Sequence, residues 1–163
     1  MRSADEAAAR DAIRELVAAY THYGDGGRFD DFCALFSADG VLELDGNRVL
    51  AGRDAIRAFV AGTAQSVRGS GERAFIRHHV SSVQITLDDA THAHGASYFL
   101  AITQRGLDHW GRYRDRYVRA GGRWLFAHRR VRLDGRAPGS WAAERQRAHQ
   151  GGGGSGTGEL GPS

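Results

Sequence analysis

The first half of the chain places its apolar residues at the spacing of helices. Ser3-Ala-Asp-Glu6 is a capping-box pattern, and Ile13, Leu16, Val17 and Tyr20 follow it at i, i+3, i+4 and i+7. A helix is therefore predicted from Ser3 to the glycine cluster that begins at position 24. Further along, the pattern predicts short helices over 30–36 and 54–60, a hairpin between them over 41–50, and a flexible connection over 62–73.

From residue 74 the apolar period changes to two. Four long strands are predicted over 74–87, 92–105, 109–120 and 123–134, with polar or glycine turns between them. Helices gathered first and antiparallel strands last predict an α+β fold, a cone-shaped barrel in which three N-terminal helices pack on a strongly curved, mostly antiparallel sheet. One domain over 1–134 and an extension over 135–163 follow, with a short helix over 141–149 and a disordered glycine-rich end.

Composition, with 41 % apolar and 25 % charged residues, adds the expectation of a soluble globular domain with a real core. No apolar run reaches the roughly 18 residues that a membrane helix needs, and the N-terminus is too polar for a secretory signal. A cytoplasmic protein without a membrane partner is therefore predicted. Cys33 is the only cysteine and lies in an apolar run, so a small buried hydrophobe is favoured over a nucleophile.

The net charge is +3, and all of the Lys+Arg total is arginine, because the chain contains no lysine. The arginines crowd the C-terminal half, where they alternate with aromatic and acidic residues at the period of a strand. This pattern favours a solvated or subunit-facing sheet surface over a nucleic-acid site. No nucleic-acid partner is expected.

Polar residues interrupt the first long strand at Arg77-His78-His79. Neutral imidazole is a base near neutral pH, so a histidine here is a candidate for proton transfer, although strand histidines are more often structural. We take His79 as the candidate and expect His78 on the opposite face, in a structural or subunit-interface role. The histidines do not repeat a ligand spacing such as HExxH, so no metal site is predicted.

Several phrases of the sequence together resemble the SnoaL-like superfamily, whose members share the nuclear-transport-factor-2-like cone. The resemblance spans about residues 8–134 and is closest to the branch of scytalone dehydratase and bile-acid 7α-dehydratase. It rests on Ile13-Arg-Glu-Leu16 with Tyr20, Asp25 before Phe29-Asp30, Gly52-Arg-Asp-Ala-Ile-Arg57, Arg77-His-His79, His109-Trp-Gly-Arg-Tyr-Arg-Asp-Arg-Tyr117 and Trp124-Leu-Phe-Ala-His-Arg129.

The resemblance implies a set of catalytic residues. Asp25 falls on the aspartate that pairs with a histidine in those dehydratases, His79 on that histidine, and Tyr20 on a tyrosine of the same pocket. Such a dyad implies cofactor-independent abstraction of a proton next to a carbonyl. The dehydratases carry a further acid or histidine on the second long strand, where this chain has Phe99-Leu-Ala-Ile102. The general acid is therefore not evident.

The resemblance also implies residues that line the cavity. Tyr113 and Gly111 fall where the scytalone enzyme has pocket-lining residues, and Tyr98, Phe36 and Phe59 are taken as further substrate-binding residues. On the same face as Tyr113, Asp115 is expected as a buried charge paired with an arginine. Trp110 and the even-numbered arginines are expected on the convex face, which this superfamily commonly uses for homodimers.

Two classes of function remain open. The leading hypothesis is a lyase, isomerase or cyclase that acts on a small hydrophobic, carbonyl-bearing substrate of polyketide, steroid or aromatic type without a cofactor. The alternative is a non-catalytic member, either a small-molecule-binding protein or the small subunit of an oxygenase. The sequence does not identify the substrate.

Overall fold

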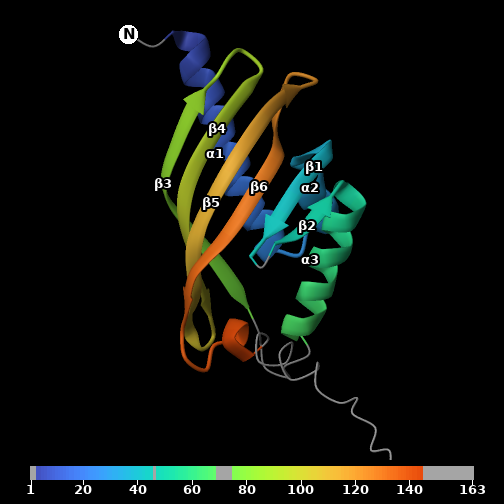
Figure 1. The fold of residues 1–163 in the computed structure, drawn as a ribbon, viewed down its shortest axis with the longest axis vertical. Helices are drawn as coiled ribbons and strands as arrows, with labels where there is room; N and C mark the ends of the chain where they lie inside the picture. The colour runs from blue at the N-terminus through green and yellow to red at the C-terminus, as the bar shows by residue number, and fades with distance from the viewer. Residues whose placement is uncertain (1–2, 46, 69–74, 145–163) are drawn as a thin grey trace, which may run out of the picture.

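The computed structural model describes residues 3–45, 47–68 and 75–144 and has the predicted α+β architecture (Figure 1). The elements follow in the order α1 (Ala4–Asp25), α2 (Phe29–Ala34), β1 (Phe36–Leu44), β2 (Arg48–Ala51), α3 (Arg53–Arg68), β3 (Ile76–Leu87), β4 (His92–Thr103), β5 (Gly106–Ala120) and β6 (Arg123–Arg136). The strands form one sheet in the order β2-β1-β6-β5-β4-β3. Every described pairing is antiparallel except that of β1 with β6.

Helix α1 begins and ends where its sequence predicts. The Ser3 hydroxyl accepts a hydrogen bond from the Glu6 amide at 3.1 Å, which satisfies one of the free amides of the first turn. The helix ends at Asp25, and the following Gly27 has a φ of 70°, a conformation that glycine adopts without strain. The C-terminal end of α1 thus carries a carboxylate toward the sheet.

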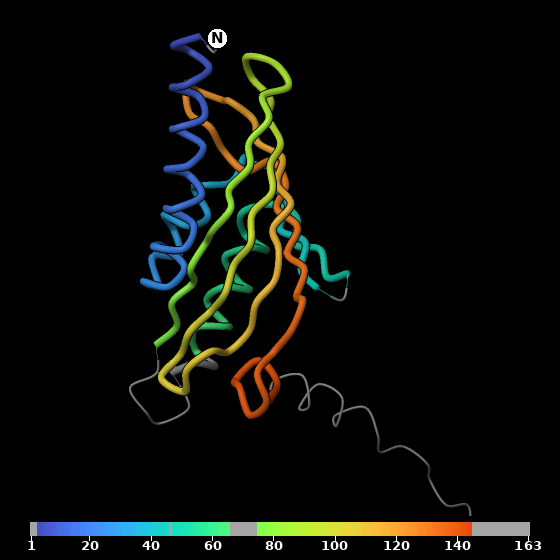
Figure 2. The backbone as a smooth tube through the Cα atoms, turned by 90° about the vertical axis from the view of Figure 1, so that its left-hand side faces the viewer, coloured from blue at the N-terminus to red at the C-terminus, as the bar shows by residue number. Residues whose placement is uncertain are grey.

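The long strands β3 to β6 curve around one side of α1 (Figures 1 and 2). Register shifts interrupt the ladders between β3 and β4, between β4 and β5, and between β5 and β6, and such bulges increase twist and bend a strand. At Gly111 a Cβ atom would lie 2.0 Å from the Arg132 carbonyl oxygen, so the close approach of β5 and β6 requires glycine there. The curvature gives the sheet an inner face toward the helices and an outer face away from them.

The core lies between α1, α2, β1 and the inner face of β5 and β6. Its aromatic rings are in mutual contact, with centroids of Phe36 and Phe126 5.3 Å apart and of Tyr117 and Phe126 5.5 Å apart. Cys33 is buried in the same cluster, as expected for a small hydrophobe. This cluster fixes the position of α1, and therefore of its last residue, against the sheet.

Some predicted boundaries shift. Helix α2 starts after Arg28 rather than at an Asp30 cap, and β1 already begins at Phe36, beside Phe126 of β6. Helix α3 continues through Gly62 to Arg68, so the first part of the predicted connection is helical. Residues 141–144 form a helical turn. The rest of the connection, the rest of that helix and the glycine-rich end lie outside the described residues.

Candidate active site

Asp25, at the end of α1, meets His78 of β3. Its Oδ1 lies 2.6 Å from His78 Nδ1, and its Oδ2 accepts a hydrogen bond from the His78 backbone amide at 2.8 Å. The side chains of Asp25 and His78 are 9 % and 23 % exposed. Because an ionised carboxylate only accepts, Nδ1 of His78 is the donor, and the carboxylate fixes both the tautomer and the orientation of the ring.

The prediction that Asp25 would meet His79 is wrong by one residue. The first part of β3 points Ile76, His78 and Val80 inward, and His79 is exposed on the outer face. Beyond the bulge between Ser81 and Gln84, the inward positions become odd-numbered. The register of the strand's second half therefore cannot be carried back to its histidines.

A second histidine and aspartate lie next to the first pair. Asp108 Oδ1 is 2.8 Å from His109 Nδ1, and the two imidazole centroids of His78 and His109 are 5.8 Å apart. Asp108 is fully buried and also accepts hydrogen bonds from the backbone amides of Trp141 at 2.8 Å and Ala142 at 3.3 Å. Burial lowers the pKa of His109, and the hydrogen bond to Asp108 only partly opposes this. Neutral imidazole therefore predominates at His109 near pH 7.

His109 and Asp108 were not among the predicted site residues, although a signal for His109 was present. In β5 the residues Gly111, Tyr113 and Asp115 were expected on one face, and His109 shares their odd numbering. All four are buried on the inner face. The sequence pattern around Asp108 did not indicate its role, because the backbone amides that bind it come from a segment more than 30 residues later.

Aromatic rings form a wall beside the two histidines. The Phe99 ring centroid lies 6.2 Å from that of His78 and 5.8 Å from that of His109, and Phe99 stacks on Tyr113 at 4.5 Å with an interplanar angle of 12°. Tyr113 is thus on the inner face, where it was expected. Gly111 lies on this face as well, where its lack of a side chain clears the Arg132 carbonyl.

Tyr20 lies one turn of α1 before Asp25 and continues the aromatic wall. Its ring centroid is 5.9 Å from that of Tyr113 and 4.6 Å from that of Phe32. Burial raises the pKa of Tyr20, and the charges of Asp115 and Asp25 add to this, while the charge of Arg129 and its hydrogen bond oppose it only in part. The phenol therefore remains protonated and available as a hydrogen-bond donor.

Arg129 and Asp115 form an ion pair beneath this wall. Arg129 Nε and Nη2 donate to the two Asp115 oxygens at 2.8 and 2.7 Å, and the Tyr117 hydroxyl donates to Asp115 at 2.9 Å. The guanidinium carbon lies 4.1 Å from the ring centroids of both Tyr20 and Tyr113. Burial acts to lower the pKa of Arg129, but the Asp115 charge and hydrogen bonds outweigh it, so the pKa is raised. The expected pairing of Asp115 with an arginine is confirmed.

The other predicted binding residues lie elsewhere. Tyr98 is 57 % exposed on the outer face, because β4 turns the neighbouring Phe99 inward, so its predicted place in the cavity is wrong. Phe36 is fully buried in the core. Phe59 is partly buried on α3, with the guanidinium carbon of Arg48 4.9 Å from its ring centroid.

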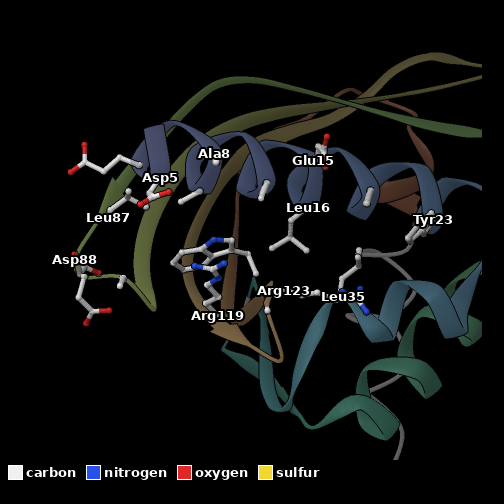
Figure 3. A pocket seen from close by; sticks show the side chains of 18 residues that line it. Asp5, Ala8, Glu15, Leu16, Tyr23, Leu35, Leu87, Asp88, Arg119 and Arg123 are labelled. Atoms are coloured by element: carbon white, nitrogen blue, oxygen red, sulfur yellow. The ribbon is translucent and has the colours of Figure 1, made fainter. Parts of the chain in front are cut away.

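A recess of about 1090 Å³ runs along α1, but it does not contain the histidines (Figure 3). Leu16 and Leu35 point into it, and Asp5, Asp88 and Arg119 lie at one end. Within 3–45, 47–68 and 75–144, no group of three or more His, Cys, Asp or Glu side chains is placed to hold a metal ion. None of the helices in those ranges is long and apolar enough to cross a bilayer.

The family profile described as a SnoaL-like domain matches residues 5–130, so the chain belongs to the SnoaL-like family. None of the curated proteins with which it was compared matches it. A Novosphingobium aromaticivorans structure provisionally assigned as a scytalone dehydratase is 25 % identical with a TM-score of 0.72, over 82 % of this chain and 89 % of its own.

Two further structures are similar. An NTF2-like protein with a cystatin-like fold, also from Novosphingobium aromaticivorans, is 24 % identical with a TM-score of 0.67, over 83 % of this chain and 86 % of its own. A Catenulispora acidiphila protein solved in complex with S-DNPA is 25 % identical with a TM-score of 0.67, over 87 % of this chain and 98 % of its own. The nuclear-transport-factor-2-like fold and the resemblance to scytalone dehydratase-like proteins are confirmed.

Proposed function

We propose that the protein is a cofactor-independent acid–base enzyme, a dehydratase, isomerase or cyclase, that acts on a small hydrophobic molecule bearing a carbonyl group. The observation that carries the proposal is the contact between Asp25 and His78, which places an oriented imidazole beside aromatic rings. Membership in the SnoaL-like family and the similarity to a scytalone dehydratase-like structure support it. The proposed base is His78 rather than His79.

His78 acts as the base through its second ring nitrogen. Asp25 holds the proton on Nδ1, so the lone pair on Nε2 accepts a proton from the carbon next to the substrate carbonyl. The imidazolium that forms is stabilised by the Asp25 carboxylate. General-base catalysis of this kind contributes about 10²- to 10⁴-fold.

Tyr20 is the proposed donor to the substrate oxygen. The negative charge that leaves carbon with the proton develops on the carbonyl oxygen, and a protonated phenol stabilises it there. Tyr20 lies on the same aromatic wall as Tyr113, and the Asp25 charge is felt at its hydroxyl. An aromatic wall of Phe99, Tyr113 and Tyr20 suits a hydrophobic polyketide, steroid or aromatic substrate.

The base is tested with 1-tetralone, a bicyclic aromatic ketone whose α-protons exchange with deuterium only after proton abstraction. We expect the wild type to accelerate this exchange in D₂O, and His78→Gln and Asp25→Asn each to lose about 10²- to 10⁴-fold of the acceleration. The double variant should be little worse than either single variant, because the two residues act as a unit.

His79→Gln is the matched control, since it changes the neighbouring histidine on the outer face. It should exchange 1-tetralone like the wild type. If His78→Gln keeps the wild-type rate, or if His79→Gln loses it, the assignment of the base is wrong. NMR of the ketone measures the exchange, and circular dichroism checks that each variant is folded.

Ligand binding without turnover is the second candidate function. It is favoured by the Catenulispora acidiphila relative, which was solved in complex with S-DNPA. Tight binding of aromatic ketones, with no exchange or elimination by the wild type and no change of affinity in His78→Gln, would support it. For either function we propose a cytoplasmic homodimer, and the exposed Tyr98, Leu100 and Trp110 of the outer face support the dimer.

A further inference from the structure

We propose that His109, held by Asp108, is a second proton-transfer group of the same site and serves as the general acid that partners the base His78. This rests on the proposed acid–base function and supplies the acid that the second long strand lacks. It places that acid on the third long strand, β5, and makes the C-terminal extension part of the site.

The two imidazoles face each other across one small residue. His78 of β3 pairs in register with Ala101 of β4, and Ala101 pairs with His109 of β5. Side chains two strands apart in a sheet start about 9.6 Å from each other, because neighbouring strands are about 4.8 Å apart. The ring centroids are only 5.8 Å apart, at an interplanar angle of 72°, so both side chains lean over the buried Ala101. A larger residue at position 101 would fill the space between them.

Asp108 prepares His109 as Asp25 prepares His78. It accepts backbone amide hydrogen bonds from Trp141 at 2.8 Å and from Ala142 at 3.3 Å, which hold the carboxylate in place. The carboxylate accepts from Nδ1 of His109, which leaves Nε2 as the nitrogen that exchanges protons. The extension around residues 137–142 thus orients a side chain of the site.

The charges around His109 determine when it carries a proton. Asp108 lies beside it on β5, His78 faces it from β3, Arg136 approaches from β6, and the neutral Phe99 packs from β4. Burial lowers the pKa of His109 most, and the charges of His78 and Arg136 add to this, while Asp108 opposes them. When His109 does carry a proton, it gives it up readily, as an acid should. A charge on one imidazole disfavours a charge on the other, so the pair carries at most one proton, and the reactive form is the one with that proton on His109.

The proposed dehydration balances in protons. His78 Nε2 takes the proton from the carbon next to the carbonyl as that C–H bond breaks and the C=C bond forms. The C–O bond of the β-hydroxyl breaks, and this oxygen leaves as water with the proton from His109 Nε2. The proton now on His78 then returns to His109, which restores the starting state without a cofactor.

The competing interpretation is that His109 only helps Asp108 to anchor the C-terminal segment. A structural anchor needs the hydrogen bond to Asp108 but takes no part in turnover, so the two interpretations differ in the elimination reaction below. The titration of His109, which NMR of ¹⁵N-labelled histidine rings measures in the full chain without any ligand, tests the tautomer and the coupling to His78 that the proposal requires.

We expect His109 to be protonated on Nδ1 in its neutral form and to titrate below the ordinary histidine pKa. His78→Gln should raise the pKa of His109, because it removes the facing charge. His79→Gln, the matched change on the outer face, should leave it unchanged. A neutral His109 protonated on Nε2, or a titration that His78→Gln does not move, would overturn the proposal.

A pair of probes separates the acid from the base. 1-Tetralone requires only proton abstraction, whereas 3-hydroxy-1-tetralone must also expel its hydroxyl to give 1-naphthol. We expect His109→Gln, whose amide can still donate to Asp108, to lose about 10²- to 10⁴-fold in elimination and to keep exchange within about threefold. Its elimination should also lose the part of the pH profile that depends on a protonated acid.

The outcomes for His109 and His78 are distinguishable. Equal retention of both reactions in His109→Gln, or an equal loss of both, would show that His109 is not the acid, while the loss of exchange in His78→Gln would leave the base in place. Retention of exchange in His78→Gln would instead contradict the proposed function itself.

Discussion

The inner and outer faces of the long strands carry the same kinds of residue in opposite environments. His78 and His79 are neighbours in sequence, yet the first contacts a carboxylate beside an aromatic wall and the second is exposed. Acid and arginine pairs differ in the same way. Arg129 and Asp115 are fully enclosed on the inner face, whereas Arg112 and Asp134 form a pair on the outer face with side chains 49 % and 39 % exposed.

Residue type alone therefore does not decide what a charged group does in this fold. On the outer face, water screens the charges, so such pairs contribute about 0–1 kcal/mol. On the inner face, each charge depends on its partner, because a buried charge without one is very costly. The inner face thus combines an enclosed ion pair, Arg129 with Asp115, and two histidines that are each held by a carboxylate.

The largest expected effect comes from breaking the inner ion pair. Arg129→Met should destabilise the fold by about 3–5 kcal/mol, because Asp115 is left buried and charged and, among the described residues, keeps the Tyr117 hydroxyl as its side-chain partner. Urea unfolding followed by tryptophan fluorescence measures this. Adding Asp115→Leu should recover much of the loss, since the uncompensated charge is then removed.

The outer pair is the matched control for that prediction. Asp134→Asn removes the partner of Arg112 and should change the free energy of unfolding by at most about 1 kcal/mol. Similar losses in Asp134→Asn and Arg129→Met would show that burial does not separate the two faces as described.

The second effect concerns catalysis at the aromatic wall. Tyr20→Phe keeps the ring that contacts Phe32 and Tyr113 and removes only the hydroxyl. If the phenol stabilises the substrate oxygen, the rate of 1-tetralone exchange should fall by about 10- to 1000-fold while the fold persists. Tyr23→Phe changes a tyrosine of the same helix whose ring is covered by Arg28, and it should exchange like the wild type. Equal rates in both variants would assign Tyr20 to the core alone.

The fold and half of the site could be predicted from the sequence. Periodicity and the capping box at Ser3 located α1 and the long strands, and the resemblance to the dehydratases identified Asp25 as a site residue. The position of Tyr113 on the inner face and the burial of Asp115 also follow from alternation in β5, which remains regular over those residues.

What the sequence did not predict depends on bulges and distant contacts. His79 was assigned by its position in the resembled dehydratases, and the bulge near Ser82 reverses the inward face of β3, so alternation through Val83 and Ile85 could not have corrected it. In β4 the same one-residue uncertainty led to the prediction that Tyr98 lines the cavity, whereas its neighbour Phe99 is the residue that points inward. Asp108 acquires its role only when residues 141 and 142 fold back onto it, and no local pattern indicates such a contact.

A smaller effect on stability should appear as the pH falls. The pKa of His109 is lower in the folded state than its ordinary value of about 6.5, so the unfolded chain binds the proton more readily. Its contribution to stability is therefore full above about pH 6.5, decreases as the pH falls toward the lowered pKa, and is constant below it. His109→Gln should lack this component, whereas His94→Gln, a change at an exposed histidine of the outer face, should retain it. Urea midpoints between pH 5 and pH 8 measure the difference.

The last prediction concerns assembly through the outer face, where the fold itself should hardly be affected. Tyr98, Leu100 and Trp110 are 57 %, 38 % and 36 % exposed, and Leu100 pairs in register with Trp110, so apolar side chains on β4 and β5 adjoin. Covering them with a second copy of the chain would remove this surface from water, and a homodimer is therefore predicted.

Leu100→Glu should shift the mass measured by light scattering toward the monomer's 17.7 kDa and leave the melting temperature of the fold nearly unchanged, because the side chain replaced lies outside the core. Thr86→Glu places the same charge on the exposed side of β3, away from the apolar residues, and should keep the dimer. A wild-type mass of 17.7 kDa at every concentration would refute the dimer and leave the proposals for the inner face intact.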